Sequence, residues 1–397
     1  MFQTISNLFK IPDLKKKILF TLALIFIYRI GSFVPTPGID GAKLMMFFDN
    51  MAKTQGGTLF GMMNMFSGGA MEKLTIFALG IMPYISASII LQLLTVVIPA
   101  LERLSKEGEA GHKKMTQYTR YGTVILALIQ SFFIALWLEN PDRFQGLQIV
   151  QYPGISFRLL TMITLTTGTA FIMWLGEQIQ EYGIGNGISL IITAGIVSRM
   201  PTALIQLISL VSPFSPEKSQ IDPLKLIILG FMLIVVVVAT ILITQGQRKI
   251  PIQYAKRVIG RKVYGGQNTY IPLRVNQAGV IPIIFAQSLI MFPATIAGIV
   301  PNQQLQSIAN ALMHGHWLYN ILYTLLIVFF CYFYTAITFN PVDIANNMKR
   351  HGGFVPGIRP GKQTAEYLGF MMTRITLPGA ICLAIIAVMP TTISKSM

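Results

Sequence analysis

The chain has 397 residues, of which 53% are apolar and only 12% are charged, and its mean hydropathy is +0.60. Water-soluble globular proteins usually carry about one charged residue in four, so the composition excludes a soluble enzyme or a disordered scaffold. The formal net charge of +16 is typical of proteins that bind nucleic acid, but the apolar residues form long blocks that leave no charged surface for DNA.

Nine apolar blocks are long enough to cross a membrane as helices. A hydrocarbon core of about 30 Å requires roughly 20 residues, because each helical residue rises about 1.5 Å. Only helices and closed barrels pair all their backbone groups in lipid, and the sequence lacks the alternating pattern of barrel strands. It therefore predicts an all-α polytopic membrane protein. The predicted spans lie near 18–34, 74–99, 118–138, 157–176, 187–206, 224–244, 278–300, 318–338 and 370–390.

The first predicted span contains Arg29, which is costly in lipid unless it finds a partner within the bundle or reaches an edge. We expect a structural partner for it. Between the first two spans, Thr58 to Ala70 form a short apolar segment that is rich in Met and Phe. Such a segment is too short to cross the bilayer. Its pattern favours equally a re-entrant segment and an external amphipathic helix that rests on the membrane.

Two connecting loops are distinctive. Gly183 to Gly187 precede the fifth span and follow no strand, so we expect a tight turn rather than a dinucleotide-binding loop. The loop from Gln245 to Ala278 holds seven Lys and Arg and no acid. Its basic residues alternate with β-branched and aromatic ones, which predicts an ordered protrusion. This loop either marks topology and contacts anionic lipid, or forms a docking surface for an acidic partner, RNA included.

The distribution of positive charge predicts the orientation. Twenty Lys and Arg lie on the side of the membrane that holds the N-terminus, and nine lie on the opposite side. Cytoplasmic loops of membrane proteins carry an excess of Lys and Arg. The N-terminus is therefore predicted to be cytoplasmic, in a multi-pass protein.

The sequence offers little for catalysis, metal binding or ion coupling. None of the 15 Asp and Glu lies deep in a block, whereas proton relays need ionisable groups at membrane depth. His314 and His316 lie in an external loop without a third ligand nearby, so a solvated pair is favoured over a metal site. Cys331 and Cys382 both lie inside apolar blocks. We expect no catalytic residue, no metal and no cofactor.

Several long strings carry a family resemblance. In chain order they are NMFSGGA, FALGIMPYISASIILQLL, EGEAGHKKMTQYTRYGT, MWLGEQIQEYGIGNGISL, QYAKRVIGRKVYGGQ, VNQAGVIPIIFAQS and FVPGIRPGKQTAEYL. They resemble the SecY family, the large subunits of the bacterial protein-conducting channel of the general secretory pathway. The resemblance runs from about Lys15 to Pro390. It implies a two-halved helical bundle in the plasma (inner) membrane, with halves 1–206 and 207–397 around a central pore. Unfolded secretory polypeptides would pass across, and hydrophobic segments would leave sideways into lipid.

The resemblance also implies roles for individual residues. The family's pore ring maps onto Ile81, Ile85, Ile188, Ile192 and Ile284, and residues four apart share one helix face. The plug maps onto the segment 58–70, which includes Asn64, Met65, Phe66, Ser67, Gly68 and Gly69, and this favours the re-entrant alternative. Arg261, Lys262 and Arg359 map onto docking positions for the motor ATPase SecA and the ribosome. The implied partners are SecE and SecG, SecA, the ribosome, signal sequences, translocating polypeptides and membrane lipids, but not DNA. A lateral gate for signal sequences is implied between spans two and three and spans seven and eight.

The family has ten spans, and this chain ends at Met397 after the ninth predicted span. We therefore expect the tenth span, and one member of the ring, to be missing. The main alternative is a small-molecule secondary transporter, which would need a polar site at the midplane. A passive scaffold subunit is a third possibility, but it would leave the plug-like segment unexplained.

Overall fold

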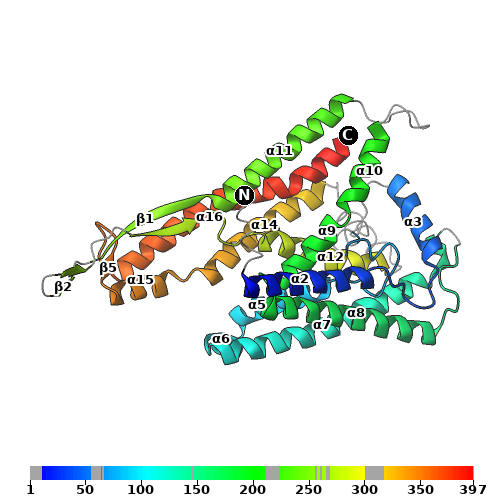
Figure 1. Ribbon diagram of the computed structural model, residues 1–397, viewed down its shortest axis with the longest axis horizontal. Helices are drawn as coiled ribbons and strands as arrows, with labels where there is room; N and C mark the ends of the chain where they lie inside the picture. The colour runs from blue at the N-terminus through cyan, green and yellow to red at the C-terminus, as the bar shows by residue number, and fades with distance from the viewer. Residues whose placement is uncertain are drawn as a thin grey trace. The chain divides into compact units, whose positions relative to one another are not determined.

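The structure is a computed structural model that describes residues 11–54, 64, 67–144, 147–211, 223–254, 257–259, 262–264, 269–299 and 317–396. Its contacts divide the chain into two compact units (Figure 1). Unit 1 comprises Met1–Gln220 and Met291–His314, and unit 2 comprises Ile221–Ile290 and Gly315–Met397. The division into 1–206 and 207–397 stays a prediction.

Unit 1 is a bundle of helices. The long helices α7 and α8 pack against each other, α5 packs on α7, and both α2 and α9 pack on α8. The elements are α2 (Pro12–Gly31), α3 (Gly41–Thr54), α5 (Met82–Val97), α6 (Pro99–Lys106), α7 (Glu109–Leu138), the 3-10 helix η1 (Pro141–Phe144), α8 (Ile155–Tyr182), α9 (Gly187–Val197) and α10 (Met200–Val211).

The core of unit 1 lies where α3, η1, α7 and α8 meet. The ring of Phe144 packs edge-on against Phe47 and Trp137, with centroid distances of 4.7 and 4.6 Å. Offset and edge-on aromatic pairs contribute attraction beyond their apolar burial. The amphipathic α3 is thereby fixed against the end of α7.

The second predicted span starts later than expected. The sequence predicted helix from about residue 74, but residues 74–81 form turns and α5 begins at Met82. Leu74 and Gly80 adopt positive φ angles of 41° and 57°, which a right-handed helix does not allow. Pro83 lies at the start of α5, where its missing N–H costs no hydrogen bond. After Ile98 the chain bends by 103° into α6.

The fifth predicted span is divided into α9 and α10. The break falls at Ser198 and Arg199, and the Ser198 hydroxyl donates to the Gly195 carbonyl at 2.6 Å. Pro201 is the second residue of α10, where its missing N–H costs no intrahelical hydrogen bond, and this is typical of a helix start. The turn predicted before α9 is confirmed. Asn186 caps α9 by accepting from two backbone N–H groups, those of Ile188 and Ser189.

Unit 2 combines helices with two small sheets. The helix α14 packs against α16, and α15 also packs on α16. The elements are α11 (Pro223–Gln245), β1 (Gln247–Tyr254), β2 (Arg257–Ile259), β3 (Lys262–Tyr264), β4 (Thr269–Arg274), α14 (Trp317–Thr338), α15 (Pro341–Arg350), β5 (Gly353–Phe354) and α16 (Lys362–Ser396). The helix α12 (Ile281–Ile299) begins in unit 2 and ends in unit 1.

Six helical stretches among the described residues are long and apolar enough to cross a membrane, and one of them, Gly187–Ile205, runs from α9 into α10. The number rises to seven if the bent pair α5 and α6 forms one span. The helix α2 falls outside this group because three lysines and Arg29 lie within its 20 residues. All nine predicted blocks contain helix, which supports a polytopic α-helical membrane protein. The count of nine spans stays a prediction.

Candidate functional site

The described end of the predicted plug is a buried turn. Asn64 and Ser67 are 6% and 2% exposed, and Gly68 and Gly69 have φ angles of 67° and 90°. Positive φ is readily adopted only by glycine, so these two residues allow the chain to reverse. The Gly69 N–H donates to the Asn64 carbonyl at 2.8 Å. Met65 and Phe66, like residues 58–63, lie outside the described residues.

Polar contacts fix this turn to two helices. Arg29 on α2 donates to the Gly68 carbonyl at 3.2 Å, and its guanidinium lies over the Phe33 ring at 5.2 Å. The partner expected for Arg29 is thus confirmed. On the other side, Arg199 at the α9–α10 junction forms an ion pair of 2.7 Å with Glu72.

The stretch that follows the turn packs as non-helical backbone inside unit 1. Phe77 is 2% exposed and stacks between Tyr28 of α2 and Phe171 of α8, at centroid distances of 5.9 and 6.0 Å. Gly31 leaves room for the Phe77 ring, and Gly168 for the carbonyl of Ile76, because a Cβ at either glycine would overlap these atoms. Irregular backbone at membrane depth is tolerated where protein covers it.

Four of the predicted ring residues lie on two helices of unit 1. Ile81 and Ile85 stand at the start of α5 and are 4% and 7% exposed. Ile192 of α9 is 9% exposed. Ile188 is half-buried, and its Cγ1 would lie 3.1 Å from a Cβ on Gly176 of α8. The fifth, Ile284, is half-buried on α12, in the part that belongs to unit 2.

The predicted basic protrusion is an ordered β structure. Strand β1 pairs antiparallel with β4 over Gln247–Ile252 and with β5 at Gln253 and Tyr254, while β2 pairs with β3. Figure 1 shows β1 continuing from α11, with β2 toward the far end of the protrusion. Strand β5 lies after α14 in the sequence, so this sheet joins the basic loop to the loop before α16. The prediction of order is confirmed for the described residues of the loop, 247–254, 257–259, 262–264 and 269–274.

A small core supports the protrusion. Its side chains come from β1, β4 and the segments around α15 and α16, and burial of such apolar groups stabilises the pairing of elements distant in sequence. The buried members are Ile250, Ile252, Leu273, Phe339, Met348, Val355, Leu368 and Met372.

Of the predicted docking residues, the structure describes Lys262 and Arg359. Arg359 is exposed between β5 and α16, and its carbonyl accepts a hydrogen bond of 2.9 Å from the Thr364 hydroxyl. Lys262 begins β3, opposite Ile259 of β2. Arg261 lies outside the described residues. One sheet and its core therefore connect the two segments that carry the predicted docking residues.

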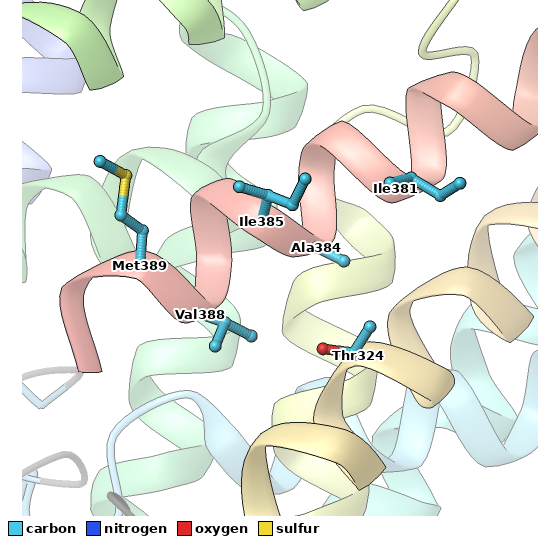
Figure 2. Close-up of a pocket in the computed structure, with 6 residues that line it drawn as sticks. All are labelled: Thr324, Ile381, Ala384, Ile385, Val388 and Met389. Atoms are coloured by element: carbon cyan, nitrogen blue, oxygen red, sulfur yellow. The ribbon is translucent and has the colours of Figure 1, made fainter. Parts of the chain in front are cut away.

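Figure 2 shows an apolar pocket between α14 and α16, with a volume of about 330 Å³. The only hydroxyl among its lining residues comes from Thr324, so it offers no charged group for a substrate or metal. Across the described residues, no three His, Cys, Asp or Glu gather at one place. His314 and His316 lie outside the described residues. The other lining residues are Ile381, Ala384, Ile385, Val388 and Met389.

Glu72 and Arg199 are the site residues that sequence analysis missed. The sequence does not relate one to the other, because 127 residues separate them in the chain. The available signal was that each lies next to an interruption of an apolar block. Charges at such interruptions often find partners in the bundle rather than in water.

Comparison with known proteins identifies the family. The sequence model of the SecY family matches residues 75–397. The chain is 50% identical over 382 residues to the protein translocase subunit SecY of Escherichia coli K12, covering 95% of this chain and 84% of that protein. It is 45% identical over 395 residues to protein translocase subunit SecY of Aquifex aeolicus, covering 99% and 90%.

Solved structures agree in fold. The structure described as that of a protein conducting channel matches with a TM-score of 0.62 and 17% identity, over 96% of this chain and 86% of that one. Sec61 in the canine ribosome-channel complex from the endoplasmic reticulum matches with a TM-score of 0.53 and 15% identity, over 95% and 91%. Neither sequence nor fold supports the small-molecule transporter alternative. The chain belongs to the SecY family.

Proposed function

We propose that this chain contains three functional sites, which are a pore ring, a plug and a docking surface. As a member of the SecY family, the chain is the pore-forming subunit of a protein translocation channel. The ring consists of Ile81, Ile85, Ile188, Ile192 and Ile284, the plug of residues 58–70, and the docking surface includes Arg261, Lys262 and Arg359.

The ring acts as an apolar constriction for an unfolded polypeptide. Branched apolar side chains exclude water and ions from a narrow passage without binding any substrate side chain strongly. The near-complete burial of Ile81, Ile85 and Ile192, together with their positions in two helices, supports this role. The plug occupies the resting channel and moves when a polypeptide enters. Its buried glycine turn and its contacts to α2 and α9 support a defined resting position.

The docking surface binds the motor ATPase SecA and the ribosome. Matching structures include the idle yeast Ssh1 complex bound to the yeast 80S ribosome, at a TM-score of 0.53, and the canine complex above. The exposed guanidinium of Arg359 and the basic hairpin suit the phosphates of ribosomal RNA and acidic side chains. SecE and SecG complete the complex. Signal sequences enter through the lateral gate that membership of the family implies, and hydrophobic segments leave there into lipid.

The chain spans the bacterial inner membrane with its N-terminus in the cytoplasm, as the excess of Lys and Arg on that side supports. It catalyses no reaction itself. Energy for translocation comes from the bound partner, because this chain contributes a passage rather than a nucleotide site.

The 50% identity to protein translocase subunit SecY of Escherichia coli K12, over 95% of this chain, carries the proposed channel function. Its test is photocrosslinking from position 192 to a stalled, radiolabelled secretory chain in membranes that contain this protein and its partners. We expect a crosslink that requires a functional signal sequence. The matched control is position 163, an isoleucine of α8 that is 62% exposed. Equal crosslinking from both positions, or none from 192 while Arg359 still crosslinks to the docked partner, would contradict the assigned ring.

A further inference from the structure

We propose that Glu72 and Arg199 are positioning residues that hold the plug in its resting place. Their ion pair fixes Asn64, the first described residue of the plug, to the junction of α9 and α10. This inference rests on the proposal that residues 58–70 form the plug, and it adds which charges determine how readily that plug leaves.

Three short contacts meet at Glu72. Its Oε2 accepts from Arg199 Nη2 at 2.7 Å and from Asn64 Nδ2 at 2.8 Å. Its backbone N–H donates to Asn64 Oδ1 at 3.0 Å. The amide of Asn64 thus uses both its donor and its acceptor on one residue, and that residue is itself fixed by Arg199. Displacement of Asn64 would break two of these contacts and leave its buried amide to find new partners.

A second contact places the turn against the same helix. Gly68 has a φ angle of 67°, and a Cβ built on it would lie 3.0 Å from the Cα of Gly195 in α9. Arg29 donates to the Gly68 carbonyl at 3.2 Å from the α2 side. The turn therefore lies in backbone contact with α9, one helical turn before Arg199. Arg199 and Glu72 connect that helix to Asn64.

The burial of the pair sets the size of the effect. The Glu72 side chain is 16% exposed and the Arg199 side chain 37%. Hydrogen bonds to a charged group shift an equilibrium by about 10- to 100-fold when they are lost. Solvent around Arg199 screens its charge, so we expect the lower end. Neutralising Glu72 should raise the population of the displaced plug by about tenfold.

The chain contains a matched ion pair without this role. Glu139 at the end of α7 and Arg158 in α8 also lie 2.7 Å apart, with side chains 10% and 38% exposed. Glu139 accepts in addition from the Gly154 backbone at 3.0 Å. Among the described residues, the hydrogen bonds of these two side chains reach no residue of the plug. A general loss of stability should affect both pairs alike, whereas plug positioning should depend only on Glu72 and Arg199.

The experiment measures the resting ion conductance of the assembled channel complex in planar bilayers, without substrate. We expect Glu72→Gln and Arg199→Gln each to raise conductance by about tenfold, and Glu139→Gln to leave it unchanged. The conservative variant Glu72→Asp keeps a carboxylate that can accept from both Arg199 and Asn64, so it should raise conductance less than Glu72→Gln does. This order is not expected from a general packing defect, because Asp removes more side-chain volume than Gln.

A deletion of residues 60–66 separates this inference from the plug proposal. If the deletion leaves conductance unchanged, the assignment of the plug is wrong. If the deletion raises conductance while Glu72→Gln does not, the plug assignment stands and the positioning role is refuted. An equal rise from Glu139→Gln, or a rise from Glu72→Asp as large as that from Glu72→Gln, would also refute it.

Discussion

Gly168 of α8 provides the sharpest test of the packing that supports the plug. A Cβ at this position would overlap the backbone carbonyl of Ile76, and it would lie 3.3 Å from Cδ1 of Phe77. The carbonyl cannot withdraw easily, because two backbone hydrogen bonds to the segment 34–36 fix the turn that carries it. Ile76 N–H donates to the Val34 carbonyl at 3.0 Å, and Thr36 N–H donates to the Leu74 carbonyl at 3.1 Å. We therefore expect Gly168→Ala to destabilise unit 1.

Two opposing terms set the magnitude. Overpacking of a tight site costs typically 1–3 kcal/mol, and a clash with fixed backbone belongs at about the upper end of that range. Alanine stabilises a helix by about 1 kcal/mol relative to glycine. The expected net loss is about 2 kcal/mol, which is roughly a 30-fold shift in the folding equilibrium.

The assay is unfolding in mixed micelles with increasing dodecyl sulfate, followed by circular dichroism and by tryptophan fluorescence. Gly230→Ala in α11 is the matched control, because a Cβ there meets nothing within 4 Å. That variant should be neutral or gain up to about 1 kcal/mol from helix propensity. If Gly168→Ala is as stable as Gly230→Ala, the close approach of Ile76 to α8 is wrong.

Three further predictions concern two helix caps and the small core that supports the protrusion. Asp40 caps α3, and backbone and side-chain hydrogen bonds from Lys43 lower the pKa of its carboxyl group. The ionised carboxylate therefore stabilises the fold above the unfolded pKa of about 3.9. This stabilisation is lost as the pH falls through the lower pKa of the folded state. Asp40→Asn keeps the cap and removes the titrating carboxylate. The free energy of unfolding of this variant should depend less on pH between about pH 5 and pH 2. Leu273→Ala removes a fully buried side chain from the small core and should cost about 2–5 kcal/mol locally, seen as faster amide exchange in β1 and weaker ribosome binding. Tyr270→Ala on the same strand, where the ring is 49% exposed, should affect exchange far less. Asn340→Ala removes the cap of α15, which accepts from two backbone N–H groups, and should cost about 1 kcal/mol; an unchanged unfolding midpoint would contradict the capping contact.

The sequence was sufficient for the membrane character and for the approximate positions of the described long helices, although the fifth predicted span is divided into α9 and α10. Length and hydropathy of a block determine whether a segment can cross a bilayer, because lipid demands that a segment pair its own backbone groups. The same local reasoning found the turn at Asn186 and the order in the basic loop. It failed at residues 74–81, where apolar composition predicted helix and the chain forms turns instead. Neighbouring helices cover these residues, so their irregular backbone is tolerated. This cover depends on the tertiary fold.

The site residues also divide into those that the sequence predicts and those that only the tertiary structure reveals. The resemblance to the SecY family assigned the isoleucines of the ring and the glycines of the plug, since those motifs are contiguous strings. The contact between Glu72 and Arg199 was invisible, because no local pattern relates two charges that are 127 residues apart. Likewise, Gly31 and Gly168 look like ordinary helix residues until Phe77 and Ile76 lie against them. By itself the sequence determined what each segment can be in a membrane, because that depends on local hydropathy and backbone hydrogen bonding. Only the tertiary structure decided which distant groups meet, because long-range contacts arise from packing and leave no periodic signal in the chain.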